Sequence, residues 1–200
     1  MAPPVARFQI GNKQRGHVKE ATDEQLMQAI AKGDLAAFNE LVLRHQDLAW
    51  RMAYRFLGDA MEAEDVAQET FLKILEAAPR YRPTATFQTY FYRTLTHLCI
   101  DRTRKKQLTS IDDIPEAIDP SLSPAESLLE KELQDQIHLA LDALPPSQKA
   151  AMILRHYEGL SYSEIGQILG VTPKAVEGLI SRAGVSLQAR LSHLQENEKN

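Results

Sequence analysis

The sequence predicts an all-α protein with two small helical domains joined by a flexible acidic linker, the C-terminal domain containing a helix-turn-helix. Apolar residues recur at three-to-four spacing along most of the 200 residues, and capping residues stand where helices should begin and end. One stretch without this period, residues 107–124, separates the two halves. The hydrophobic content of 44% is sufficient for real cores, which excludes a disordered chain.

Neither membrane insertion nor secretion is expected. The chain has no run of about 18 apolar residues, and its N-terminal segment lacks the apolar core of a signal peptide. The single cysteine, Cys99, allows no internal disulfide, which fits a reducing compartment. We therefore expect a cytoplasmic protein.

The net charge of −4 is unevenly distributed along the chain. Residues 21–76 contain five cations and eleven anions, residues 87–110 five cations and one anion, and residues 111–135 one cation and eight anions. Because electric fields act over a Debye length of about 8–10 Å, these local balances matter more than the total. The pattern predicts alternating acidic and basic surfaces.

Residues 1–20 contain prolines and glycines without a helical period, so we expect a mobile N-terminal extension. The first domain, residues 21–106, then opens with three helices. Thr22 and Gln25 predict a capping box at the start of the first helix. The boundaries of the next two helices are marked by Asp34, Gly58 and Asp59.

The third helix, which begins after Asp59, combines an apolar stripe with a charged face. The charged face is formed by Glu62, Asp65, Gln68, Glu69 and Lys73. A solvated acidic face is the usual meaning of such a pattern, and a docking surface for a basic partner is the functional alternative. From the pattern alone we favour the solvated face.

Aromatic residues and cations alternate in the segment that follows. Five of the thirteen aromatic residues fall between Tyr81 and Tyr92, and the surrounding cations are Arg80, Arg82, Arg93, Arg102, Arg104, Lys105 and Lys106. A helix starting near Ala85 would have one face with Phe91, Leu95, Leu98 and Arg102, preceded by Phe87, and another with Tyr90, Arg93, His97, Asp101 and Arg104. Aromatic side chains among cations suit single-stranded nucleic acid, where each stacked base contributes about 1–3 kcal/mol. A plain core helix with a solvated face is the alternative.

Residues 107–124 hold three prolines, four acids and three serines, which predicts an extended, negatively charged linker. The second domain, residues 125–194, should contain a helix to about Leu144, another that ends at Gly159, and then a helix-turn-helix. Residues 195–200 would form a polar tail.

The helix-turn-helix is predicted between residues 160 and 182. Its capping residues are Ser161 with Glu164, Gly170, and Thr172 with Pro173. The residues expected to hold the two helices together are Ile165, Leu169, Val171, Val176 and Leu179, with the small Gly166 at their close approach. This complete set favours a DNA-binding motif over an ordinary helical hairpin.

The outward residues of the second helix would be Lys174, Glu177, Gly178, Ser181 and Arg182. Lys174 and Arg182 suit phosphate contacts, whereas Glu177 and Ser181 could reach base edges. Two cations predict weak binding by this helix alone, because phosphate neutralisation supplies most non-specific affinity.

In this order, the motifs of residues 22–194 resemble a bacterial RNA polymerase sigma factor of the extracytoplasmic-function (ECF) group of the sigma-70 family. DAMEAEDVAQETFLKIL resembles the helix that binds the clamp helices of the polymerase's largest subunit. The resemblance assigns core-polymerase binding to Asp65, Gln68 and Glu69, and so reverses the choice of a merely solvated face. It also implies an anti-sigma factor that masks the polymerase-binding faces.

FQTYFYRTLTHLCIDRTRKK resembles the segment that melts and reads the −10 promoter element. The resemblance implies −10 DNA contacts by Tyr81, Phe87, Tyr90, Arg93, His97, Arg102, Arg104 and Lys105. The family usually has tryptophan at the position of Tyr90, where tyrosine can still stack, and asparagine at that of His97.

ALDALPPSQKAAMILRHYEGLSYSEIGQILGVTPKAVEGLISRA resembles the module that reads the −35 element while docked on the flap of the polymerase's second subunit. It implies −35 DNA contacts by Thr172, Lys174, Glu177, Ser181 and Arg182. The common Thr-Val-Lys-Ser-Arg run is Ala-Val-Glu-Gly-Leu here, at residues 175–179, so several of the usual phosphate contacts are absent. The acidic linker suits a segment threaded through the basic channel of the polymerase.

Two interpretations from other classes stay open. One is a stand-alone transcriptional regulator that uses the same helix-turn-helix on duplex DNA. The other is an enzyme using His97, Cys99 and Asp101, which is weak because His97 and Asp101 share a helix face and Cys99 does not. The sequence shows no nucleotide-binding glycine loop, metal-ligand cluster or nucleophile–base pair, so we expect no cofactor and no catalytic activity.

Overall fold

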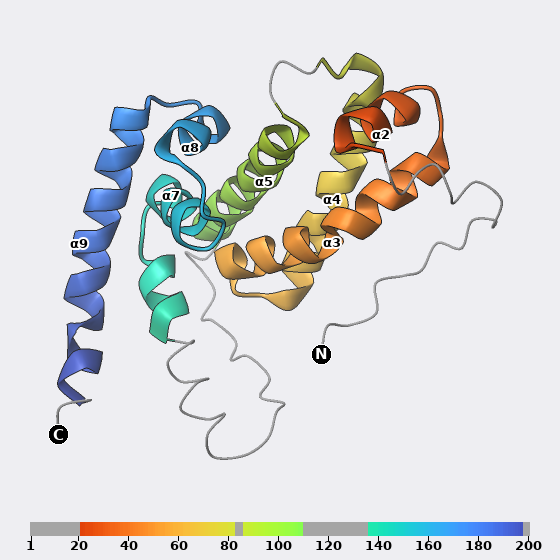
Figure 1. The fold of residues 1–200 in the computed structure, drawn as a ribbon. Coiled ribbons are helices and arrows are strands. Elements are labelled where there is room, and N and C mark those ends of the chain that lie inside the picture. Colours follow the sequence, from red (N-terminus) through yellow and green to blue (C-terminus); the bar gives the residue numbers. More distant parts are fainter. Residues whose placement is uncertain (1–20, 83–85, 110–135, 198–200) are drawn as a thin grey trace.

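A computed structural model describes residues 21–82, 86–109 and 136–197, and these residues form an all-α fold. Figure 1 shows α5 in the middle, with α2, α3 and α4 on one side and α7, α8 and α9 on the other. The helices are α2 (Asp23–Ile30), α3 (Leu35–Leu57), α4 (Ala60–Ala77), α5 (Phe87–Thr109), α7 (Pro146–His156), α8 (Tyr162–Leu169) and α9 (Pro173–Asn197), with a 3-10 turn η1 (Ala78–Arg80) and a further helical stretch at 136–142. The predicted extension 1–20 and most of the linker 107–124 lie outside the described residues.

Local capping sets the starts of α2, α3 and α4, as predicted. Thr22 and Gln25 form a reciprocal capping box at α2. The Asp34 carboxylate accepts from the backbone N–H groups of residues 36 and 37 at α3, and Asp59 accepts from the Glu62 N–H at α4. Each carboxylate satisfies N–H groups that have no partner within the helix, which stabilises each start by about 1 kcal/mol.

Two helices are longer than predicted. Helix α5 continues to Thr109, into the stretch assigned to the linker, and α9 continues to Asn197, past the expected domain end at residue 194. Neither extension contains proline or glycine, so nothing in the local sequence stops the helix there. Helix α5 also begins at Phe87 rather than near residue 85.

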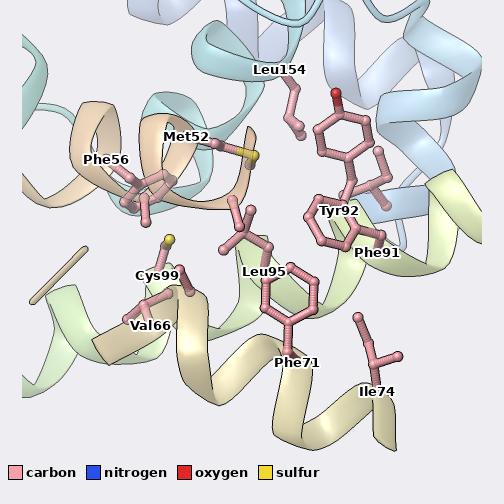
Figure 2. Packing of buried hydrophobic residues seen from close by; sticks show 14 of the residues in the cluster. Met52, Phe56, Val66, Phe71, Ile74, Phe91, Tyr92, Leu95, Cys99 and Leu154 are labelled. Atoms are coloured by element: carbon pink, nitrogen blue, oxygen red, sulfur yellow. The ribbon is translucent and has the colours of Figure 1, made fainter. Parts of the chain in front are cut away.

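The core of the first half lies between α3, α4 and α5. Its fully buried side chains include Leu41, Met52, Phe56, Val66, Ile74, Phe91 and Leu95. Figure 2 shows residues of all three helices converging on this core. Burying each of these side chains stabilises the fold by about 1.5–3 kcal/mol. Together, these packing contacts hold α5 in place against α3 and α4.

The predicted helix-turn-helix is confirmed in α8 and α9. Gly170 ends α8 with a left-handed φ of 69°, and Ser161 with Glu164 forms the capping box. Ile165 and Val176 are buried as expected. The expectation for Val171 is wrong: its side chain is 39% exposed, and Ile168 occupies the core position instead. The turn after Gly170 directs Val171 outward, whereas Ile168 lies one helical turn after Ile165 on the inner face of α8.

The two groups of helices also pack against each other, which the sequence did not indicate. Helix α8 packs against α5, and α7 packs against α3 and α5. Ala150, Ile153 and Leu154 of α7 belong to the same buried cluster as the core of the first half. In Figure 2, Leu154 points toward the core that also contains Met52 and Tyr92.

Gly166 is predicted to be a position where only glycine fits. A Cβ atom there would lie 2.7 Å from the carbonyl oxygen of Val171, which is backbone and cannot turn away. We expect Gly166→Ala to lower the free energy of unfolding by about 1–3 kcal/mol in urea denaturation. Gly184→Ala is the matched control, because a Cβ at this position of α9 meets nothing within 4 Å and should stabilise by about 0.5–1 kcal/mol. Equal effects of the two changes would contradict the close-approach argument.

Candidate nucleic-acid interface

The N-terminus of α5 is held in place by a residue far away in the sequence. The backbone N–H of Phe87 donates to the Glu24 carboxylate of α2 at 2.9 Å. This backbone hydrogen bond, followed by one from the backbone of Glu24 itself, lowers the pKa of Glu24. The start of α5 therefore has a local cap, because the Thr86 hydroxyl accepts from the Thr89 N–H at 3.3 Å, and a second, distant cap from α2.

The predicted −10 residues on the outer face of α5 are accessible. Arg93, His97, Arg104 and Lys105 are exposed, while Tyr90 and Arg102 are half-buried. The His97 Nδ1 lies 2.7 Å from the Arg93 carbonyl oxygen. Because a carbonyl only accepts, Nδ1 donates, and Nε2 of the neutral ring is left as an acceptor. This face therefore offers cations together with one acceptor for a base edge.

The structure corrects the assignment of Phe87. Its side chain has no exposed surface, and its ring lies 5.3 Å from that of His45 and 6.1 Å from that of Phe91. Phe87 is the first residue of α5, one turn before Phe91 on the apolar face, so it packs in the core rather than against DNA.

A hollow of about 490 Å³ lies beside the N-terminal end of α5. The rings of Tyr81 and Tyr90 meet edge to face there, with centroids 5.5 Å apart. Three cations and one acid complete the lining, with the full set being Lys73, Glu76, Ala77, Arg80, Tyr81, Arg82 and Tyr90. The contribution of Lys73 and Glu76 was not predicted, because they belong to α4 and only the fold brings the end of α4 next to α5.

The Tyr81 hydroxyl is an unusual feature of this hollow. Its oxygen is buried and has no hydrogen-bond partner among the described residues. Burial, together with the nearby charge of Glu24, raises the pKa of Tyr81, so the group stays a neutral donor. A buried donor without an acceptor costs free energy, and a ligand could supply the acceptor only if the lining of the hollow shifted to expose the hydroxyl.

The outer face of α4 presents the residues assigned to polymerase binding. Asp65 and Gln68 are exposed, and the half-buried Glu69 lies 3.5 Å from Lys73 and 3.7 Å from Arg102 of α5. Two apolar residues on the same stripe were not predicted to belong to it: Met61 is 80% exposed and Leu72 is 57% exposed. The positions 61, 65, 68 and 72 follow a helical period, so the polar residues stand between two exposed apolar ones.

The five residues predicted to contact the −35 element are all exposed at the start of α9: Thr172, Lys174, Glu177, Ser181 and Arg182. The Thr172 hydroxyl caps the helix by accepting from the Ala175 N–H at 3.2 Å. Lys174 pairs with Glu177 at 2.7 Å. The guanidinium of Arg182 lies beside Gly178, where a Cβ atom would approach Nη1 to 3.3 Å. Of the two cations among these five residues, Lys174 is therefore in an ion pair with another of the five, and Arg182 is not.

Comparison with known proteins identifies the family. Residues 41–109 match the family model Sigma-70 region 2, and residues 134–184 match Sigma-70, region 4. The chain is 36% identical to the ECF RNA polymerase sigma factor SigE of Mycolicibacterium smegmatis over 96% of its own length and 77% of that relative. It belongs to the sigma-70 family, as an ECF sigma factor.

Further relatives agree. The sigma factor is 32% identical to the RNA polymerase sigma-H factor of Pseudomonas aeruginosa, over 86% of its own length and 95% of that relative. Its fold is similar to that of CnrH, solved in complex with the cytosolic domain of CnrY, with a TM-score of 0.64 and 26% identity over 86% of this chain and 97% of that one. The promoter-recognising function predicted from the motifs is thereby confirmed.

The structure offers little to the enzyme interpretation. Burial raises the pKa of the Cys99 thiol of the sigma factor to about 12, so it is not a thiolate at neutral pH. Within residues 21–82, 86–109 and 136–197, no group of three or more His, Cys, Asp or Glu residues could hold a metal ion. In the same ranges no helix is long and apolar enough to cross a membrane.

We expect Glu24→Gln to destabilise the sigma factor by about 1 kcal/mol at pH 7, because the charged acceptor at the start of α5 is lost. The lowered pKa makes this contribution fully present above the ordinary value of 4.5 and removes it as pH falls through the lower folded value. The difference from wild type should therefore shrink below pH 4.5 in urea denaturation at a series of pH values. The exposed Asp47→Asn is the control, and a difference independent of pH would contradict the capping role.

Proposed function

We propose that this sigma factor binds core RNA polymerase through α4, captures unstacked bases of the −10 element with α5 and the adjacent hollow, and reads the −35 element with α9. The observation that carries the proposal is the hollow of Tyr81 and Tyr90, where two aromatic rings stand among cations. Aromatic faces stack on bases of any sequence, and cations track the phosphates. No similar arrangement is needed for binding to intact duplex DNA alone.

Promoter melting would be driven by binding energy. A base leaving the duplex loses stacking, and stacking on protein returns about 1–3 kcal/mol for each base. The rings of Tyr81 and Tyr90 would supply the stacking surface. The Tyr81 hydroxyl, whose oxygen is buried in the free chain, would donate to a base only after the lining of the hollow shifts.

The exposed face of α5 would hold the rest of the melted strand. Arg93, Arg104 and Lys105 are accessible to phosphates, and the half-buried Arg102 lies beside them. His97 would accept a hydrogen bond at Nε2 from an exocyclic amine of a base, since its Nδ1 is already used within the helix. The asparagine usual in the family offers an acceptor and a donor, so the base preference of this chain should differ there.

The polymerase surface would combine charge with apolar anchors. Asp65, Gln68 and Glu69 fit a basic partner, and the exposed Met61 and Leu72 extend the same face in both directions. Buried apolar anchors within a polar rim are typical of protein interfaces. We assign this face to the clamp helices of the largest polymerase subunit.

The −35 reader would depend on the polymerase for affinity. Lys174 is paired with Glu177, so few cations at the start of α9 are available to neutralise phosphates. Docking of this unit on the flap of the second subunit would place it at high effective concentration over its element. The two units, each of which would bind DNA weakly alone, would then together select promoters that carry both elements.

Regulation would use a protein that covers these faces. The similar proteins CnrH and RpoE of Bartonella quintana were solved with CnrY and with the anti-sigma factor NepR, respectively. We infer that this sigma factor also has an anti-sigma partner, and that it works in the cytoplasm without cofactor or catalytic activity of its own.

Tyr81→Phe should separate promoter melting from folding. The free chain loses an unpaired buried hydroxyl, so its stability should be unchanged or higher, whereas open-complex formation should slow about five- to tenfold because the bound base loses a donor. Stopped-flow fluorescence of a −10 base analogue measures the melting step. Tyr90→Ala is the comparison, and should slow melting more than it weakens binding to core polymerase. An equal loss in both assays would indicate misfolding.

Leu72→Lys should weaken binding to core polymerase by about tenfold or more, because it removes an apolar anchor and places a cation on a face that binds a basic partner. Leu43→Lys is the matched control on α3, where the leucine is similarly exposed at 55%. Titration of core polymerase with labelled chain measures both. If wild type fails to bind polymerase and instead shifts a duplex site unaided, the proposal is wrong and the chain is a stand-alone regulator.

A further inference from the structure

Met61 carries the most exposed sulfur atom in the described part of the chain. The residue lies in the first turn of α4 and is 80% exposed. The other methionines of the described ranges are protected, since Met27 and Met52 have no exposed surface and Met152 is half-buried against the core of the second half. A thioether is open to two-electron oxidation when an oxidant can reach it. Exposure therefore singles out Met61.

The single cysteine, Cys99, is protected as well. It has no exposed surface, and its sulfur lies with that of Met52 inside the core between α3, α4 and α5 (Figure 2). Burial raises the pKa of its thiol to about 12, so the reactive thiolate is scarce at neutral pH. An oxidant that arrives from solvent therefore meets the thioether of Met61 first.

Met61 also stands at one end of the exposed stripe of α4. Under the proposed function, Met61 and Leu72 are apolar anchors about 16 Å apart along the helix, with polar residues between them. Oxidation of Met61 would bring a polar S=O group into a contact that the partner buries, and burial of that group without a hydrogen-bond donor costs free energy. Leu72 has no sulfur and would stay an anchor. Oxidation should therefore weaken binding without abolishing it.

The fold of α4 does not depend on the Met61 side chain. The helix start is set by the Asp59 carboxylate, which accepts from the Glu62 N–H at 2.8 Å. The buried face of α4 lies on the other side of the helix and consists of Ala63, Val66, Ala67, Thr70, Phe71 and Ile74. A chain oxidised at Met61 should keep its structure and change only at its surface.

We propose that Met61 is a modification site, at which oxidation to methionine sulfoxide weakens binding of this sigma factor to core RNA polymerase and reduction restores it. The proposal rests on the proposed function for the role of the α4 face. Selective oxidation of Met61 is a property of the free chain and is measured without polymerase.

Hydrogen peroxide can supply the oxygen atom. The Met61 sulfur attacks one peroxide oxygen with an electron pair, so an S–O bond forms as the O–O bond breaks. The leaving hydroxide takes the proton of the transferred hydroxyl and becomes water, and the two electrons lost by sulfur reduce the peroxide. A methionine sulfoxide reductase with a dithiol reverses the change, giving the thioether, a disulfide and water. Because hydrogen peroxide is uncharged, the neighbouring acids Glu64 and Asp65 do not repel it.

Peptide mapping by mass spectrometry, after the folded chain has been exposed to hydrogen peroxide, tests the site. Met61 should be oxidised about tenfold or more faster than Met27 and Met52, because the core excludes the oxidant from both. In urea, where the core is open, the three rates should become equal. Similar rates for Met61 and the two buried methionines in the folded chain would overturn the proposal.

Titration of core polymerase with labelled chain tests the effect on binding. The full chain is oxidised and freed of peroxide before mixing, so that the polymerase never meets the oxidant. Oxidation should weaken binding of the wild type about five- to tenfold, whereas Met61→Leu should have the same affinity before and after treatment. Methionine sulfoxide reductases A and B with dithiothreitol should together restore the wild-type value, because each enzyme reduces one sulfoxide epimer.

Met152→Leu is the matched control. Met152 lies in α7, away from the α4 face, so this variant should lose affinity on oxidation as the wild type does. Circular dichroism should show unchanged helix content after treatment. The proposal is overturned if wild type with Met61 fully converted binds as the untreated chain does, or if Met61→Leu loses as much affinity as the wild type. Failure of the untreated chain to bind polymerase would instead refute the proposed function, and the peptide map would still decide whether Met61 is the oxidised site.

Discussion

Burial of one face of α5 is the constraint on which the rest of the structure depends. The helix is covered by α3 and α4 from one half of the chain and by α7 and α8 from the other, and its first N–H group is capped by Glu24 of α2. With Phe91 and Leu95 anchored in the core, the helical period leaves Arg93, His97 and Arg104 outside. The same packing that gives stability therefore sets the direction of the face that we propose binds DNA.

The surfaces that we propose for polymerase and for DNA share a border. Acidic α4 and basic α5 lie side by side, and Glu69 approaches Arg102 across them at 3.7 Å. Exposed ion pairs of this kind contribute little to stability, so either partner is available to a stronger ligand. Under the proposed function, opposite charges on neighbouring helices would keep a polyanion on one face and a basic protein partner on the other.

The second half combines a core of its own with a junction to the first half. Its helix-turn-helix has a local core, closed by Ile165, Ile168 and Val176 around the glycine at 166, yet its inner face also joins the core of the first half. Lys149 and Glu158 are buried in that junction with partners that water could replace. Buried charges of this kind are tolerated because each has a partner, Asp142 for Lys149 and Arg55 for Glu158.

Local sequence determined the helices, their caps and the residues of the outer faces, because capping boxes and helical periods involve neighbours three or four residues apart. Ser161 with Glu164, Asp59 and Gly170 were read correctly for this reason. Only the tertiary structure decided that Phe87 is core, that Glu24 caps α5, and that Glu158 joins the two halves. The last two contacts span 63 to 103 residues of chain, and no local pattern encodes which distant surfaces meet.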